Sequence, residues 1–233
     1  MNSILKHLKE NWIRHGFETL VVTVGILGAF MLNNWNENRK SKEFEQKLEL
    51  ELYNSIQDDL PNLERAIQQT EKFGQSAQII LDYFDEDMEY HDSLRFHFSS
   101  AIGWWNIDLK AAAYETAKSY GLHFLNDDTT RILLADVYER HLPFIHKLEQ
   151  RQQDYSNFNV IPVLTEHFDL ISSGLNREMV THNYETLKND KRYRTILKTN
   201  IQKREFDLLF YNNLLDVLLD IQARIGKEIN ESN

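Results

Sequence analysis

The sequence predicts an all-α protein, in which an N-terminal transmembrane helix is followed by a long-helix antiparallel bundle with short crossing helices. Residues 19–36 carry no charge. The chain has only three prolines and eight glycines in 233 residues, and apolar residues recur at steps of three and four along two long segments, as on the buried face of a helix. We expect an amphipathic interfacial segment at 1–16, a transmembrane helix at 17–36 and a helical bundle domain at 37–233.

The uncharged segment has the length of a membrane span. Its 18 residues cover about 27 Å as a helix, close to the roughly 30 Å hydrocarbon core of a bilayer. Trp35 and Arg39 follow it, an interfacial aromatic residue and a cation able to reach the headgroups. A cleaved signal peptide and a buried core helix are the alternatives. Because no small-x-small cleavage site follows and the run has no polar face, we expect an anchor in the lipid bilayer.

The residues before the span have an amphipathic pattern. Apolar positions form one stripe, with basic residues interspersed: Ile4, Leu5, Leu8, Trp12 and Ile13, with Lys6, Lys9 and Arg14. A short basic amphipathic helix of this kind usually lies in the headgroup plane. The alternative is a solvated basic leader.

The chain after the span keeps the helical period. From Ser41, apolar residues at steps of three and four continue to Ile67, and Pro61 is expected to kink or restart this helix. A further helical piece ends in the acidic stretch 85–92, an expected loop. The next elements are predicted as helices at 93–102, 109–119, 128–155 and 162–174, with a turn at 103–108, a cap at Gly121 and a kink at Pro143.

The C-terminal segment has the clearest periodicity. From Asp190, a heptad pattern passes through Leu197, Arg204, Tyr211 and Leu218 and continues for more than four repeats. Additional apolar residues widen this stripe, which indicates burial in a bundle rather than a narrow two-chain coiled coil. We expect this helix to pack antiparallel to the long helix that follows the span.

Small residues in the span favour contact between helices. Gly25 and Ala29 are four apart with Gly28 beside them, a small-xxx-small pattern that allows close approach, although such patterns also arise by chance. Glu18 lies at the edge of the span, where it is either hydrated or paired with Arg14 or a partner subunit. The expected protein partner is a second copy of the chain or another membrane protein.

The sequence contains no recognisable catalytic, cofactor-binding or metal-binding motif. It has no cysteine and no glycine-rich phosphate loop, and its histidine pairs lack the i, i+4 spacing of zinc helices. The stretch 85–92 lacks the glycine and the final glutamate of an EF-hand loop. We therefore predict no enzyme activity, no cofactor and no metal. A net charge of −10 without a basic stripe argues against nucleic-acid binding.

Trp104 and Trp105 form the most conspicuous aromatic pair of the bundle region. Adjacent tryptophans in a short connection either close the end of a bundle as part of its core or line a ligand pocket between helices. The sequence leaves both interpretations open.

The anchor and its flanks resemble the N-terminus of a bacterial family, common in Bacteroidota, of small single-pass membrane proteins of unknown function. The matching residues are Glu18, Gly25, Ile26, Leu27, Asn33, Asn34, Trp35, Asn36, Glu37, Arg39 and Lys40. Residues 112–139 resemble a second family segment more weakly, because Ala117 replaces a leucine and Tyr120 a serine. The resemblance implies a location and a helical fold, and no activity.

We expect a membrane-anchored helical interaction module, acting as a scaffold or as an accessory subunit of a membrane complex. The alternative is a sensory or small-ligand-binding bundle that signals to a membrane partner. Three basic residues precede the span and four follow it closely, so the positive-inside rule decides little. The α-amino charge, and the acidic residues interleaved after the span, favour a bacterial inner-membrane protein with its C-terminal domain in the periplasm.

Overall fold

The computed structural model describes residues 2–173 and 176–232. Their side chains are described apart from those of 2–11, 13, 15, 170–177 and 232, so most of the predicted apolar stripe of residues 1–16 lies outside the described side chains. The chain forms two compact units, Met1–Leu48 and Glu49–Asn233. Helices dominate its described part, which confirms the predicted all-α class.

The longest helix, α1, covers Asn2–Asp85 and contributes to both units. It passes through Pro61 without ending, so a restart at this proline is wrong. Proline removes one backbone donor, and the carbonyl that loses its partner belongs to Gln57. Both residues are exposed, so water can satisfy that carbonyl. The helix ends at the predicted acidic loop, where Asp87 has a φ of 57°.

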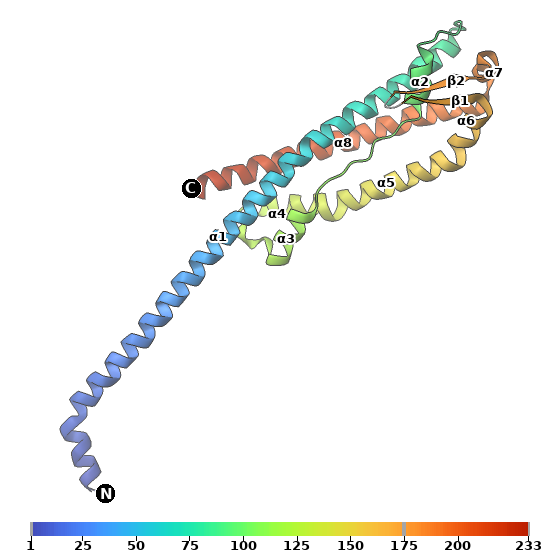
Figure 1. Cartoon of the computed structure of the whole chain (residues 1–233). Helices are drawn as coiled ribbons and strands as arrows, with labels where there is room; N and C mark the ends of the chain where they lie inside the picture. The colour runs from blue at the N-terminus through green and yellow to red at the C-terminus, as the bar shows by residue number, and fades with distance from the viewer. Residues whose placement is uncertain (1, 174–175, 233) are drawn as a thin grey trace. The chain divides into compact units, whose positions relative to one another are not determined.

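The remaining elements all lie in the second unit (Figure 1). They are α2 Leu94–Ala101, α3 Ala112–Tyr120, the 3-10 turn Leu122–Phe124, α4 Asp128–Ala135, the π-helical turn Asp136–His141, α5 Leu142–Tyr155, the π-helical turn Ser156–Val160, α6 Ile161–His167, β1 Phe168–Ser173, β2 Asn176–Thr181, α7 Tyr184–Asn189 and α8 Lys191–Ser232. The irregularity predicted at Pro143 takes the form of the first π-helical turn, which ends two residues before it.

Gly121 ends α3, as its sequence position predicts. Its φ is +105°, and its N–H donates to the carbonyls of Ala117 and Lys118. A side chain at this position would be strained, and its Cβ would also lie 2.7 Å from Nδ1 of His123. The helix before it begins at Ala112, three residues later than predicted.

The predicted helix at 162–174 is correct only in its first half. α6 ends at His167, and the chain continues as β1, which pairs antiparallel with β2. Gly174, the predicted end of that helix, lies outside the described residues. The strand begins with Phe168, whose ring packs 5.1 Å from Phe98 and 5.5 Å from Tyr193. These partners are distant in the sequence, so no local pattern reveals the strand.

Within the second unit, α8 packs antiparallel to α1, which confirms the predicted arrangement (Figure 1). Gly226 lies against the ring of Tyr53, and Gly74 lies against the side-chain stem of Arg204. Residue numbers therefore fall along α8 as they rise along α1. The α4–α5 segment packs against this helix pair, and α4 is in contact with α8.

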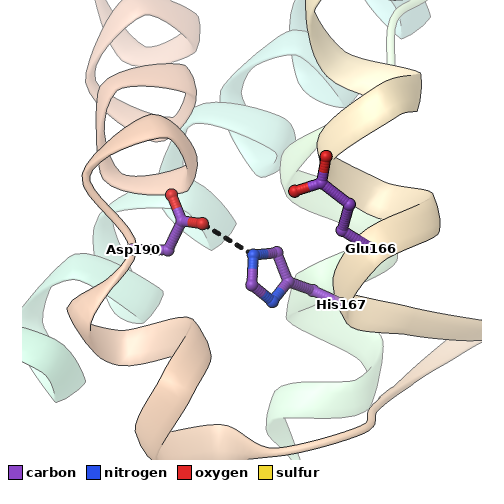
Figure 2. A group of neighbouring side chains, drawn as sticks. All are labelled: Glu166, His167 and Asp190. Atoms are coloured by element: carbon purple, nitrogen blue, oxygen red, sulfur yellow. Dashed lines mark hydrogen bonds and ion pairs between the residues drawn. The ribbon is translucent and has the colours of Figure 1, made fainter.

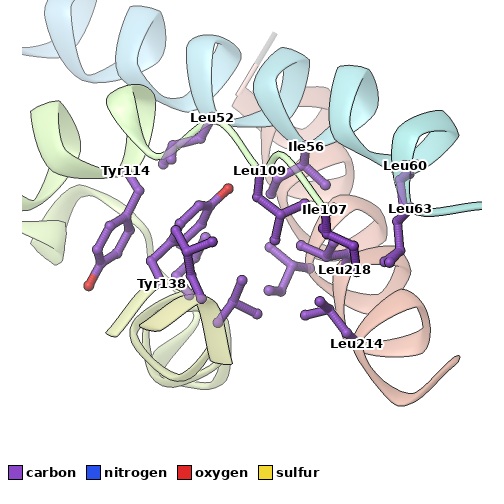
Figure 3. Packing of buried hydrophobic residues seen from close by; sticks show 14 of the residues in the cluster. Leu52, Ile56, Leu60, Leu63, Ile107, Leu109, Tyr114, Tyr138, Leu214 and Leu218 are labelled. Atoms are coloured by element: carbon purple, nitrogen blue, oxygen red, sulfur yellow. The ribbon is translucent and has the colours of Figure 1, made fainter. Parts of the chain in front are cut away.

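The bundle has two separate apolar cores. The larger joins α1, α3, α4, the first π-helical turn, α5 and α8 with residues of the connections on both sides of α3, and Figure 3 shows Leu52 and Ile56 of α1 facing Tyr138 and Leu218. The smaller joins the end of α1 to α2, the second π-helical turn, α6, the β1–β2 pair, α7 and the start of α8. Between the two, the α1–α8 interface is polar, with Thr70, Asn200 and Arg204 all buried.

Candidate functional site

The predicted anchor residues lie on an apolar helix that nothing in the first unit covers. Among the described residues, one helix is long and apolar enough to cross a membrane, and none of its apolar window is buried. Its large apolar side chains between Leu20 and Leu32 are 51–69 % exposed. A core helix of a soluble protein is mostly buried, so this exposure argues against that alternative.

The polar residues at the two ends of this segment are paired locally. Nε of Arg14 lies 3.2 Å from a carboxylate oxygen of Glu18, which is one of the alternatives that the sequence left open for this residue. At the other end, the guanidinium of Arg39 lies 5.6 Å from the ring centre of Trp35, in cation–π contact. These pairs place charge at both ends of the apolar run and none within it.

Gly25, Gly28 and Ala29 lie on one side of this helix. A Cβ added at Gly25 or at Gly28 would meet nothing within 4 Å. Neither glycine is therefore required by a contact within the described protein. A role in contact with another molecule stays a prediction.

The second candidate site is a pocket of about 340 Å³ in the bundle, which we call the tryptophan pocket. It lies beside the polar break between the two cores, where Thr70 and Arg204 belong to its walls. Its lining residues come from α1, the connection before α3, α5 and α8: Thr70, Trp104, Trp105, Leu148, Glu149, Arg151, Gln152, Thr199, Gln202, Lys203, Arg204, Phe206, Asp207 and Tyr211.

The exposure of the two tryptophan side chains distinguishes a core position from a position at the surface. Trp104 and Trp105 are 41 % and 39 % exposed, so neither belongs to the core and the core interpretation is wrong. Both line the tryptophan pocket and also a neighbouring hollow that contains Arg65. Their indole rings are thus available for contact from solvent.

Arg204 links the pocket wall to the connection that carries the tryptophans. Its Nη1 donates to Oδ2 of Asp207 at 3.0 Å and its Nη2 donates to the carbonyl of Gly103 at 2.6 Å. The side chain is 4 % exposed, and its Nε has no hydrogen-bond partner in the part of the chain that the structure describes. Burial raises the pKa of Asp207, and the Arg204 cation opposes this rise.

Two further charged groups of the pocket are held by neutral partners. Nζ of Lys203 donates to Oε1 of Gln152 at 3.3 Å and lies 3.5 Å from the ring centre of Tyr155. Burial lowers the pKa of Lys203, and the adjacent Arg204 lowers it further. Glu149 accepts the backbone N–H of Ile107 at 2.8 Å, and burial raises its pKa.

A third group contains possible metal-binding atoms that the sequence analysis did not identify. One ligand atom each of Glu166, His167 and Asp190 lies within 4.8 Å of the others (Figure 2). Nε2 of His167 is hydrogen-bonded to Oδ2 of Asp190 at 2.7 Å. Glu166 forms an ion pair with Arg192, with Oε1 3.2 Å from Nη1.

Helix capping accounts for this group without a metal. Oδ1 of Asp190 accepts the backbone N–H groups of Arg192 at 2.6 Å and Tyr193 at 2.9 Å, which caps the N-terminus of α8. Burial acts to raise the pKa of Asp190, but these bonds and the one to His167 outweigh it and lower that pKa. His167 and Asp190 are 23 residues apart, so no motif spacing could have revealed the contact.

Comparison with known proteins identifies one family. The chain matches the model of a family of unknown function, DUF6090, over residues 18–180, more than half of its length. No curated protein and no solved structure matches the chain significantly.

Proposed function

The chain belongs to the DUF6090 family, whose function is unknown, and we propose that it is a membrane-anchored helical interaction module. In this role the bundle acts as a scaffold or accessory subunit beside the membrane and performs no catalysis. The observation that carries the proposal is the uncovered apolar run from Leu20 to Leu32, 51–69 % exposed at its large side chains. Exposing this apolar surface to water would be unfavourable in free energy, whereas the hydrocarbon core of a bilayer would bury it.

The flanking residues support the same proposal. Trp35 and Arg39 have the chemistry of a membrane interface, where an indole and a guanidinium reach the headgroups. The Arg14–Glu18 pair reduces the cost of placing a carboxylate at the other edge. We propose a bacterial inner membrane, with the N-terminus in the cytoplasm and the bundle in the periplasm.

A charge placed in the anchor tests the proposal. The wild-type chain is expected to stay in the membrane pellet after salt and carbonate washes. Leu27→Lys is expected to shift much of it to the supernatant, because a lysine near the middle of a span costs about 2.5–3.5 kcal/mol. Leu50→Lys is the matched control, since Leu50 is an equally exposed leucine of the bundle unit at 48 %. A carbonate-soluble wild type would overturn the anchor.

The mass of the intact protein separates an anchor from a cleaved signal. An uncleaved anchor retains the whole of segment 17–36. A mass that corresponds to a chain starting after residue 32 would show that the apolar segment has been removed, and it would contradict the proposal.

A second candidate function is the binding of a small ligand by the bundle. The tryptophan pocket favours it, because exposed indole rings and buried charged side chains converge on one cavity of about 340 Å³. Cavities of roughly 300–1,000 Å³ are typical of small-molecule sites. This function is compatible with an anchor and has its own test below.

A further inference from the structure

The charges of the tryptophan pocket do not balance. Its lining includes three cations, Arg151, Lys203 and Arg204, and two carboxylates, Glu149 and Asp207. Asp207 is paired with Arg204 at 3.0 Å, so these two charges offset each other. Glu149 accepts a backbone N–H from the connection that carries the tryptophans.

With the Arg204–Asp207 pair set aside, two cations and one carboxylate remain, so the pocket lining keeps an excess of one positive charge. Among the described side chains, neither Lys203 nor Arg151 has an ion-pair partner. Lys203 is held by a neutral amide and by the face of an aromatic ring. A partly buried ammonium whose direct hydrogen-bond and ring partners are neutral gains more from an incoming anion than an exposed one, because the low local dielectric strengthens the attraction.

The walls beside these cations are aromatic. Trp104, Trp105 and Phe206 are 39–50 % exposed, and Tyr211 contributes a buried ring. Flat rings of this kind stack on a flat apolar ligand and are covered by it. A cavity of about 340 Å³ lies at the small end of the range for ligand sites, which fits one or two rings rather than a lipid.

We propose that the tryptophan pocket binds a small aromatic carboxylate, with its rings against Trp104 and Trp105 and its carboxylate facing Lys203 and Arg151. The proposal rests on the second candidate function, ligand binding by the bundle, and not on the membrane anchor. Arg204 acts as a positioning residue, because it ties Gly103, the residue before Trp104, to α8.

Isothermal titration of the full chain in lipid nanodiscs tests this with three probes of one shape. The probes are 2-naphthoate, 2-naphthylmethanol and 2-naphthylmethylammonium, each corrected by titration into empty nanodiscs. The carboxylate is expected to bind at least tenfold more tightly than the alcohol, and the ammonium most weakly. Acetate, which has the charge without the rings, is expected not to bind at millimolar concentration.

Substitutions then locate the bound anion. Lys203→Gln is expected to weaken 2-naphthoate binding about tenfold or more, since it removes a charge-assisted contact. The affinity for 2-naphthylmethanol is expected to stay unchanged. Arg151→Gln is expected to have a smaller effect, because this side chain is exposed and screened. Lys198→Gln, an exposed lysine of the same helix outside the pocket, is the matched control.

The possible outcomes distinguish the proposals. Equal binding of the carboxylate and the alcohol, or an unchanged affinity in Lys203→Gln, would overturn the anionic ligand and keep a ligand pocket. No binding of any probe at millimolar concentration would overturn both the ligand class and the second candidate function. The carbonate extraction above is independent of all these results.

Discussion

The buried Arg204 and the partly buried Asp207 form an ion pair at the break between the two cores of the bundle. The guanidinium lies 3.0 Å from the carboxylate, with the two side chains 4 % and 16 % exposed. Arg204 lies at a heptad position of α8 that is normally apolar, and it also donates to the carbonyl of Gly103, so we infer that holding this connection offsets the cost of burying the charge.

Removing one partner of this pair is expected to destabilise the bundle strongly. Asp207→Leu leaves a buried guanidinium, at about 3–5 kcal/mol, and Arg204→Met leaves a partly buried carboxylate, at the lower end of that range. The double variant is expected to cost less than the sum, because neither charge is then left alone. Thermal unfolding of the full chain, followed by circular dichroism as a double-mutant cycle, measures this coupling. Additive losses would show that the pair is not a unit.

Asp59 is expected to make stability fall as pH rises. Its side chain is buried, one carboxylate oxygen has no partner among the described residues, and burial raises its pKa to about 6 from 3.8. The folded state therefore binds this proton more tightly than the unfolded state does. The stability that the bound proton contributes is fully present below about pH 4 and is lost as the pH rises through about 6.

Asp59→Asn is the test of this pH dependence. The amide oxygen can still accept the N–H of Lys110, as the carboxylate does at 3.0 Å. We expect about 1–3 kcal/mol of stabilisation at pH 8, little change at pH 4, and a flatter curve of Tm against pH. Asp216→Asn, at an exposed aspartate of α8 away from Asp59 and Lys110, is the control. The same slope in wild type and Asp59→Asn would contradict the assignment.

Gly103 is required by close contact with Phe73. A Cβ at residue 103 would lie 2.6 Å from the Phe73 ring, so Gly103→Ala must displace the ring or the connection. We expect a loss of about 1–3 kcal/mol and weaker 2-naphthoate binding. Gly74→Ala is the matched control, because its Cβ would meet Arg204 at an ordinary 3.5 Å within a helix, and the helical preference of alanine should stabilise it by about 0.5–1 kcal/mol. Equal effects of the two substitutions would remove the steric explanation.

Self-association through the anchor is expected to depend on its small residues. The Cβ that Gly25→Leu or Gly28→Leu adds would meet nothing within 4 Å among the described residues, so a change in mass is expected to report on contact between chains. We expect both to lower the oligomer mass in mild detergent, measured by light scattering. Phe30→Leu changes the opposite helix face and should leave the mass unchanged. A monomeric wild type would exclude this interface.

The orientation of the bundle is tested by reporters fused after Asn233. Alkaline phosphatase is expected to be active there, and a fluorescent protein that folds only in the cytoplasm is expected to be dark. Replacing Lys6 and Lys9 with Asn removes charge that the proposed topology places in the cytoplasm, and should reduce the phosphatase signal, since basic residues hold the N-terminus inside. A bright fluorescent fusion with inactive phosphatase would place the bundle in the cytoplasm.

Periodic elements of the fold could be predicted from sequence, whereas elements fixed by distant contacts could not. The heptad from Asp190 correctly predicts α8, and Gly121 correctly predicts the end of α3, because both signals are local. β1 is set by the packing of Phe168 on Phe98 and Tyr193. A segment of six residues has no pattern that contains that information.

In the tryptophan pocket, too, local signals could be predicted from the sequence and contacts between distant residues could not. Arg204 in the apolar stripe was a visible signal that the α8 interface is interrupted, and the tryptophan pair was conspicuous in the sequence. The partners of Arg204, Gly103 and Asp207, could be assigned only from the structure. The exposure of Trp104 and Trp105 likewise depends on the course of the connection rather than on local composition.

The antiparallel contact of α8 with α1 also affects how the protein is made. Gly226 packs on Tyr53, so the apolar face of α1 is synthesised long before the helix that covers it. At ribosomal rates of about 5–20 residues per second, the interval of roughly 170 residues lasts about 10–35 seconds. During that time Leu52 and Ile56 lack α8, one of the helices that bury them. Until α8 has been made and has packed against them, these side chains are open to contacts that the finished bundle excludes.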